Sequence, residues 1–179
     1  MTRRLPPNRR LGRARASKDP GSEIWIFCEG DKTEPRYLKE FVRDHRAHLV
    51  RVIEIVGAAG VPATLVDTAA DKVKELKRRA RRSKDSFDRF FEVWGVLDVD
   101  THPNLNQACG KARECGVGLA ISNPCFELWA LLHFGDWDRP DTSKRVQGEL
   151  YAKVDAIVNG NRKILNYATM RHAYGVAHK

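Results

Sequence analysis

Two aspartates one residue apart, Asp98 and Asp100, end an apolar run that begins at residue 92. The run is rich in β-branched and aromatic residues, which predicts a strand buried on both faces. Because side chains alternate along a strand, both carboxylates should point to the same side. Neighbouring carboxylates repel each other, and a hard cation such as Mg²⁺, which prefers oxygen ligands, would relieve that repulsion. The pattern alone also allows a turn in which both aspartates are simply solvated.

Two glutamates have a similar relation to predicted strands. Glu29 directly follows an apolar run over residues 23–28. Glu127 is the one charged residue in a segment predicted to be a deeply packed helix over residues 124–134, with Asn123 as its N-cap. A buried charge must be paired or bound to a metal. A carboxylate is also favoured near a helix N-terminus, so both interpretations of Glu127 stay open.

Strands and helices alternate along the chain. Strands are predicted over residues 23–28, 50–56, 92–100 and 117–122, with helices over 34–45, 63–82 and 105–115 between them. Thr33 is the expected N-cap of the first helix, and Glu34 is expected in its first turn. This order is typical of the α/β class, a mainly parallel four-stranded sheet with helices on both faces. Right-handed crossovers bring the carboxyl ends of parallel strands to one edge, where ligands bind. We therefore expect the four carboxylates to lie at the same edge.

The net charge of +9 is concentrated in two segments. Residues 1–20 hold seven Lys and Arg against one Asp, and residues 71–85 hold eight against three acidic residues, so the remainder is slightly acidic. Two basic segments on an acidic body favour a polyanionic partner, although a solvated tail and a solvated helix face would look the same. The candidate phosphate-binding residues are Lys32, Arg78, Arg79, Arg81 and Arg82.

Three regions follow from composition. Residues 1–22 are predicted to be a disordered basic arm, residues 23–135 the α/β domain, and residues 136–179 a helical extension packed on the same domain. In the extension, a polar helix is expected over 142–159, with Val146, Leu150, Val154 and Ile157 on one face. We also expect a short helix in the last twenty residues.

No apolar stretch approaches the roughly 18 residues needed to cross a bilayer, so we expect no membrane association and a cytoplasmic location. The four cysteines lack Cys-x-x-Cys spacing and are expected to be reduced thiols. They are Cys28, Cys109, Cys115 and Cys125.

Three motifs together resemble the RloB family: Cys-Glu-Gly-Asp-Lys-Thr-Glu-Pro-Arg-Tyr over residues 28–37, Leu-Asp-Val-Asp over 97–100, and Ile-Ser-Asn-Pro-Cys-Phe-Glu-Leu-Trp over 121–129. More broadly, a strand ending in Glu-Gly and a later one ending in Asp-x-Asp resemble the Toprim domain of topoisomerases, primases and OLD-type nucleases. The resemblance covers residues 23–135.

The resemblance implies a Toprim-like sheet and a nuclease that uses Mg²⁺ or Mn²⁺ to hydrolyse DNA or RNA. Glu29 would be a general acid/base and metal ligand, Asp98 and Asp100 would hold the metal, and Glu127 is a further catalytic candidate. It also implies a phage-defence or restriction-associated system. A partner ATPase is expected by analogy with defence loci, and a homo-oligomer remains open.

Two other functions compete with hydrolysis by a Toprim-type nuclease. Similar proteins continue into an Asn-Pro-Ser-Thr-like segment, whereas this sequence ends at residues 173–179, which leaves room for a non-catalytic nucleic-acid-binding or regulatory subunit. Residues 98–101 also match the Asp-x-Asp-x-Thr signature of HAD-like phosphohydrolases. That fold carries the motif on its first strand and needs a second motif, whose one candidate has Pro140 where an aspartate is required.

Overall fold

The computed structural model describes residues 21–30, 32–54, 62–99, 104–153, 157–158 and 161–177. The predicted arm, up to residue 20, lies outside these ranges, as do Asp100, His102 and Val154. In chain order the elements are β1 (Glu23–Cys28), α1 (Thr33–Asp44), β2 (Val50–Glu54), α2 (Pro62–Arg82), the 3₁₀ helix η1 (Ser86–Arg89), β3 (Phe91–Asp98), α3 (Leu105–Cys115), β4 (Gly118–Ser122), α4 (Glu127–Leu132), α5 (Ser143–Tyr151), β5 (Ile157–Val158), β6 (Asn161–Leu165), α6 (Tyr167–Met170), the 3₁₀ helix η3 (Arg171–Ala173) and α7 (Tyr174–Ala177).

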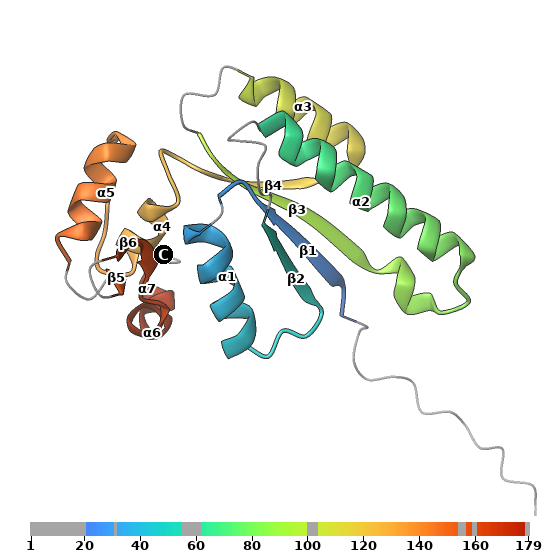
Figure 1. Cartoon of the computed structure of the whole chain (residues 1–179), viewed down its shortest axis with the longest axis horizontal. Coiled ribbons are helices and arrows are strands. Elements are labelled where there is room, and N and C mark those ends of the chain that lie inside the picture. The colour runs from blue at the N-terminus through green and yellow to red at the C-terminus, as the bar shows by residue number, and fades with distance from the viewer. Residues whose placement is uncertain are drawn as a thin grey trace, which may run out of the picture.

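The first four strands form one parallel sheet in the order β2-β1-β3-β4. In the central pair, Cys28 of β1 lies opposite Val96 of β3, and Asp98 at the end of β3 lies opposite Ser122 of β4. The predicted α/β class, with a four-stranded parallel sheet flanked by helices, is therefore confirmed (Figure 1).

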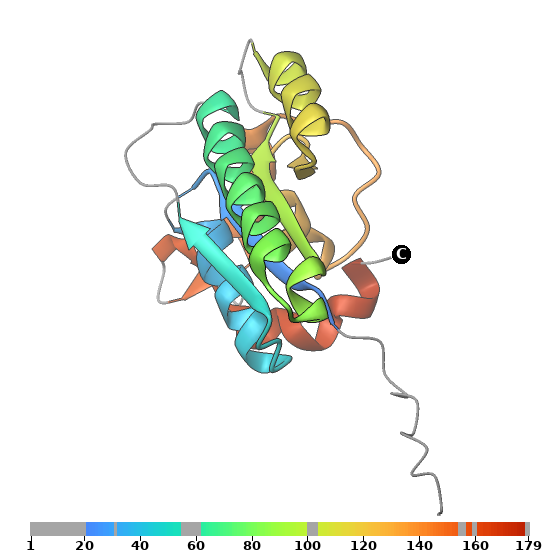
Figure 2. The same ribbon diagram turned by 90° about the vertical axis from the view of Figure 1, so that its right-hand side faces the viewer.

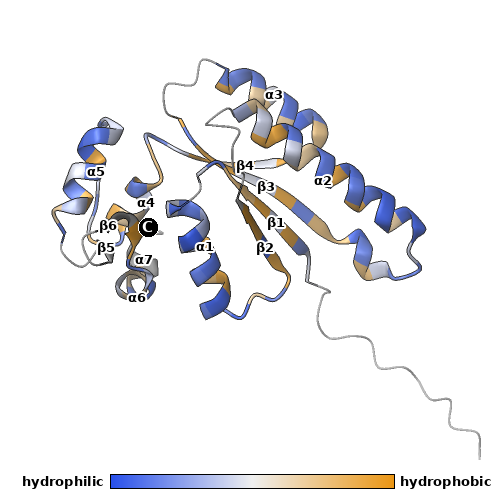
Figure 3. Ribbon diagram, viewed as in Figure 1, coloured by the Kyte–Doolittle hydropathy of each residue, from blue (hydrophilic) through white to orange (hydrophobic). Residues whose placement is uncertain are grey.

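Helices cover both faces of this sheet. α1 lies on one face, and α2 and α3 lie side by side on the other (Figures 1 and 2). α2 presents an apolar stripe to the sheet at helical spacing, and Val66, Ala69, Val73 and Leu76 from this stripe are buried. Figure 3 shows the result: the strands are mostly hydrophobic, and the outward side of α2 is hydrophilic toward its C-terminal end.

One glycine of β3 allows α2 to approach the sheet closely. A Cβ placed on Gly95 would collide with the Cδ2 atom of Leu65, a fully buried side chain of α2, and would lie 3.0 Å from Cδ2 of Leu119. The absence of a side chain at Gly95 therefore sets how tightly the helix and the sheet can pack.

The C-terminal segment packs on the α1 face. Val146 and Leu150 of α5, Leu165 of β6 and Met170 of α6 share a buried core with residues of α1 and α4. Tyr167 is also in this core, and its hydroxyl donates a hydrogen bond of 3.2 Å to Asp44 at the end of α1.

Three local predictions were wrong. α5 ends at Tyr151 instead of residue 159, because Ile157 pairs with Leu165 in an unpredicted antiparallel hairpin of β5 and β6. α4 begins at Glu127, so Asn123 and Pro124, joined by a cis peptide, precede the helix instead of capping it. α1 already includes Thr33, and Lys32 takes the N-cap position.

Candidate functional site

The order of strands places a topological switch point between the ends of β1 and β3. The chain leaves β1 for β2 on one side and leaves β3 for β4 on the other, so the connecting segments diverge at this point. In open α/β sheets, ligands bind in the crevice outside the carboxyl ends of the strands at such a switch point. Glu29 directly follows β1 and Asp98 is the last residue of β3, so these two carboxylates flank the switch point.

Backbone hydrogen bonds between the strands continue to Glu29 and to Val99, the residue after Asp98. The Glu29 N–H donates to the Val96 carbonyl at 3.1 Å, and the Val99 N–H donates to the Ser122 carbonyl at 2.8 Å. Both carboxylate side chains are half-buried. The spacing of Glu29 and Asp98 is thus fixed by strand pairing, which gives a rigid support for a binding site.

Glu127 reaches the same edge from β4. After β4 the chain crosses to the α1 face, and Glu127, 8% exposed, begins α4. It lines a pocket of about 280 Å³ together with Gly30, Lys32, Thr33 and Glu34 from the start of α1, and Gln147 and Tyr151 from α5. Glu127 is thus buried and also lies in the first turn of a helix, so its position agrees with either interpretation and does not choose between them.

Cys125 links Glu127 to Asp98. Burial raises the pKa of the Cys125 thiol to about 12, with further contributions from the charge of Glu127, a hydrogen bond to Glu127 and the charge of Asp98. The thiol is therefore protonated at neutral pH and near both carboxylates. The free, buried thiols of Cys28 and Cys125 fit the prediction of reduced cysteines, while Cys109 and Cys115 are half-buried.

The fit of this edge to a divalent cation is partial. Oε1 of Glu29 and Oδ1 of Asp98 are buried oxygen atoms that accept no hydrogen bond in the structure, although both side chains have other interactions. Carboxylate oxygens are the donors that Mg²⁺ prefers. Within the described residues, however, no group of three or more His, Cys, Asp and Glu side chains is arranged to hold a metal ion. Asp100, the second predicted metal ligand, lies outside those residues.

The predicted phosphate-binding residues divide between two edges. Lys32 is exposed and lies at the carboxylate edge, next to the N-terminus of α1. The four arginines between positions 78 and 82 lie near the end of α2, at the opposite edge of the sheet, where β3 begins (Figure 1). Among these, Arg79 forms ion pairs with Glu23 and Asp88, so it fastens the end of α2 to β1 and η1.

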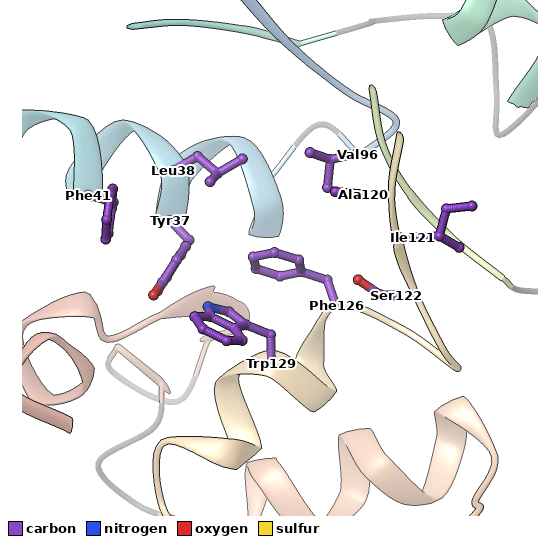
Figure 4. Close-up of a pocket in the computed structure, with 9 residues that line it drawn as sticks. All are labelled: Tyr37, Leu38, Phe41, Val96, Ala120, Ile121, Ser122, Phe126 and Trp129. Carbon is purple, nitrogen blue, oxygen red and sulfur yellow. The ribbon is translucent and has the colours of Figure 1, made fainter. Parts of the chain in front are cut away.

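A second pocket, of about 360 Å³, adjoins the carboxylate edge on the α1 face. Figure 4 shows that aromatic side chains from α1 and α4 surround it, with Ser122 on its strand side. Its lining residues are Tyr37, Leu38, Phe41, Val96, Ala120, Ile121, Ser122, Phe126 and Trp129. This pocket is predominantly apolar and therefore lacks the donors that would hold a metal.

His133 is a buried histidine with a structural role. It is 4% exposed, its Nδ1 lies 2.8 Å from the Trp129 carbonyl, and its Nε2 lies 3.5 Å from the Tyr37 hydroxyl. The Nδ1–H therefore donates to the carbonyl, and Nε2 accepts from the tyrosine. Burial lowers the pKa of His133, which keeps the ring neutral.

Sequence reasoning missed three residues of the site. Glu34 was interpreted as a first-turn residue of α1, yet its carboxylate lines the pocket of Glu127. Gln147 and Tyr151 were expected only as part of a polar helix, and their four-residue spacing on one helix face was the available signal.

None of the helices in the described ranges is both long and apolar enough to cross a bilayer. Comparisons with curated proteins and with solved structures gave no match. A scan against protein families matched the RloB-like protein model over residues 24–177. This match includes β1, β3, β4 and the whole described C-terminal segment, so the chain belongs to the RloB-like family.

Proposed function

We propose that this RloB-like chain is a Mg²⁺-dependent nuclease of the Toprim type that hydrolyses phosphodiester bonds in DNA or RNA, within a phage-defence or restriction-associated system. The single observation that carries the proposal is the position of Glu29 and Asp98 at the ends of adjacent parallel strands, on either side of the switch point. Membership of the RloB-like family supports it.

In this proposal Glu29 and Asp98, with Asp100, are the residues that would hold Mg²⁺ or Mn²⁺. The bound ion would supply a Lewis acid for the phosphate and a water of lowered pKa. Lys32 and the N-terminal N–H groups of α1 are suited to bind a phosphate oxygen, because a helix N-terminus and a cation both attract anions. Glu29 is the candidate for moving a proton to or from the reacting oxygen.

Glu127 has a supporting role in the proposal. It is buried beside Cys125, whose protonated thiol donates a hydrogen bond to its carboxylate. A carboxylate oriented in this way near Lys32 can hold the lysine side chain toward the crevice. Loss of Glu127 should therefore weaken phosphate binding more than it changes metal binding.

The test is cleavage of plasmid, single-stranded DNA and tRNA with Mg²⁺ or Mn²⁺ by the wild type and by Asp98→Asn. Glu114→Gln is a matched control, because Glu114 is an exposed carboxylate of α3 that makes no ion pair with a described residue. We expect cleavage by the wild type and the control, and a loss of at least about 100-fold in Asp98→Asn. Equal cleavage by Asp98→Asn would refute the proposed site.

A non-catalytic binding or regulatory subunit is the second candidate. It is favoured by the exposed arginines at the edge opposite the carboxylates, since they offer phosphate contacts away from the proposed reaction site. Binding of nucleic acid without cleavage under every metal condition would select this candidate.

A further inference from the structure

Basic residues form a continuous stripe on the outer surface of α2. Lys74, Lys77, Arg78, Arg81 and Arg82 follow the spacing i, i+3, i+4, i+7 and i+8, which places them on one face of the helix, and all five are exposed. We call these five residues the α2 stripe. The apolar residues of α2 are on a different face, packed against the sheet.

Most side chains of the α2 stripe form no ion pair within the described residues. Lys74 pairs with Asp71, but Lys77, Arg78, Arg81 and Arg82 make no ion pair with any described residue. Arg79, by contrast, is held by Glu23 and Asp88, although it lines the same surface hollow as Arg78 and Arg82. The stripe therefore retains a positive charge that surface pairing does not neutralise.

The arginine end of the stripe lies far from the carboxylates. β3 runs from the amino end of the sheet, at Phe91, to its carboxyl end, at Asp98. Seven residue-to-residue rises of about 3.3 Å separate these two residues by about 23 Å. The C-terminal half of α2 lies beside the start of β3, at the edge opposite Asp98 (Figures 1 and 2). Residues 1–20, with seven Lys and Arg, join the described chain at that same edge, just before β1.

We propose that the α2 stripe is an anchoring site for the phosphate backbone of a nucleic acid, separate from the carboxylate edge. Arginines bind phosphate through a planar fork of N–H donors, and three of the five stripe residues near the end of α2 are arginines. At about 3.4 Å per base pair, a duplex must exceed about seven base pairs to reach from the arginine end of the stripe to the carboxylate edge. The inference extends the proposed function but does not require cleavage.

A nucleic acid fits the stripe better than an anionic membrane does. A helix that lies on a membrane buries an apolar face in the lipid, whereas the apolar face of α2 is already packed against the sheet. The exposed large hydrophobic residues in the described chain are Leu49, Phe90, Trp94 and Ile121, and none of them is on α2.

The test is binding of labelled duplexes of about 30 and about six base pairs, measured by fluorescence anisotropy in EDTA between about 50 and 200 mM salt. The variant Arg78→Gln/Arg81→Gln/Arg82→Gln removes three charges of the stripe. The matched control Arg43→Gln/Arg46→Gln/Lys144→Gln removes three exposed charges from the side of the sheet that carries α1 and α5. Circular dichroism checks folding, which exposed substitutions should leave intact.

We expect the stripe variant to bind the long duplex at least about tenfold more weakly, with a salt slope reduced by about 2.7. The control should lose less than about threefold in affinity for the long duplex. The affinity for the short duplex should fall in the stripe variant and should be the same in Asp98→Asn as in the wild type. Unchanged affinity of the stripe variant would overturn the inference, and so would an equal loss in the control. Stripe-dependent binding to phosphatidylserine vesicles but not to duplexes would also overturn it.

These outcomes are independent of catalysis. EDTA removes the metal, so an inactive enzyme gives the same binding result as an active one. If the proposed function fails, the stripe can still bind; if the stripe fails, cleavage of short substrates can still depend on Asp98.

Discussion

Asp98→Asn should make the metal-free protein more stable while it removes stabilisation by Mg²⁺. Asp98 and Glu127 both act on the Cys125 thiol, so the two carboxylates are close to each other. For an assumed separation of about 8 Å and an effective dielectric constant of about 20, the repulsion between two unit charges is about 2 kcal/mol. Lys32 lines the pocket of Glu127 and offsets part of this repulsion, so we expect a gain of about 1 kcal/mol.

The assay is thermal unfolding in EDTA and in Mg²⁺, with Glu114→Gln as the matched control. A gain of about 1 kcal/mol raises the Tm of a chain of this size by about 2–4 °C. Mg²⁺ should raise the Tm of the wild type and of the control, because a ligand of the folded state stabilises it, and should leave Asp98→Asn unchanged. If Asp98→Asn is less stable in EDTA and gains as much from Mg²⁺ as the wild type, the reasoning is wrong.

Three further predictions concern packing and protonation. Gly95→Ala should lower the free energy of unfolding in urea by about 1–3 kcal/mol, because the new Cβ would collide with Leu65; no loss would show that α2 can move away. The free energy of unfolding should fall as the pH drops from about 7 to 5, by up to about 1.4 kcal/mol per pH unit. The reason is that burial lowers the pKa of His133, so in this range only the unfolded chain binds a proton at this ring. His133→Gln should flatten this pH profile, and an unchanged profile would contradict the prediction. At pH 8, iodoacetamide should label Cys109 before Cys125, whose pKa is about 12 and whose thiol is buried; mass spectrometry reads the order, and early labelling of Cys125 would refute its burial.

Local patterns predicted the sheet well. The run over residues 23–28 is β1 to the residue, and the apolar stretch before Asp98 is β3. Both strands lie in the centre of the sheet, where a continuous apolar run has few alternative structures. The expected burial of β3 on both faces was wrong in part, because Glu92 and Trp94 are exposed. The positions of Glu29 and Asp98 at the carboxyl ends of β1 and β3 also followed from the βα order, since they depend on the direction of the crossovers and not on side-chain detail.

The parts that failed depend on contacts between distant residues. Leu150 and Ile157 fit one helical face, but Ile157 pairs with Leu165, and this pairing gives no signal in the spacing of the apolar residues. Similarly, eight Lys and Arg in one segment look equivalent in sequence, while Arg79 is fastened by Glu23. Only the fold distinguishes a cation used for packing from one exposed to a ligand.

The central claim is that Glu29 and Asp98 hold a divalent cation at the switch point. The most direct measurement is binding of Mn²⁺, followed by electron paramagnetic resonance, to the wild type, Glu29→Gln, Asp98→Asn and Glu114→Gln. We expect the wild type and Glu114→Gln to bind Mn²⁺ alike, and the other two variants to bind at least about tenfold more weakly. Equal binding by all four proteins would contradict the claim.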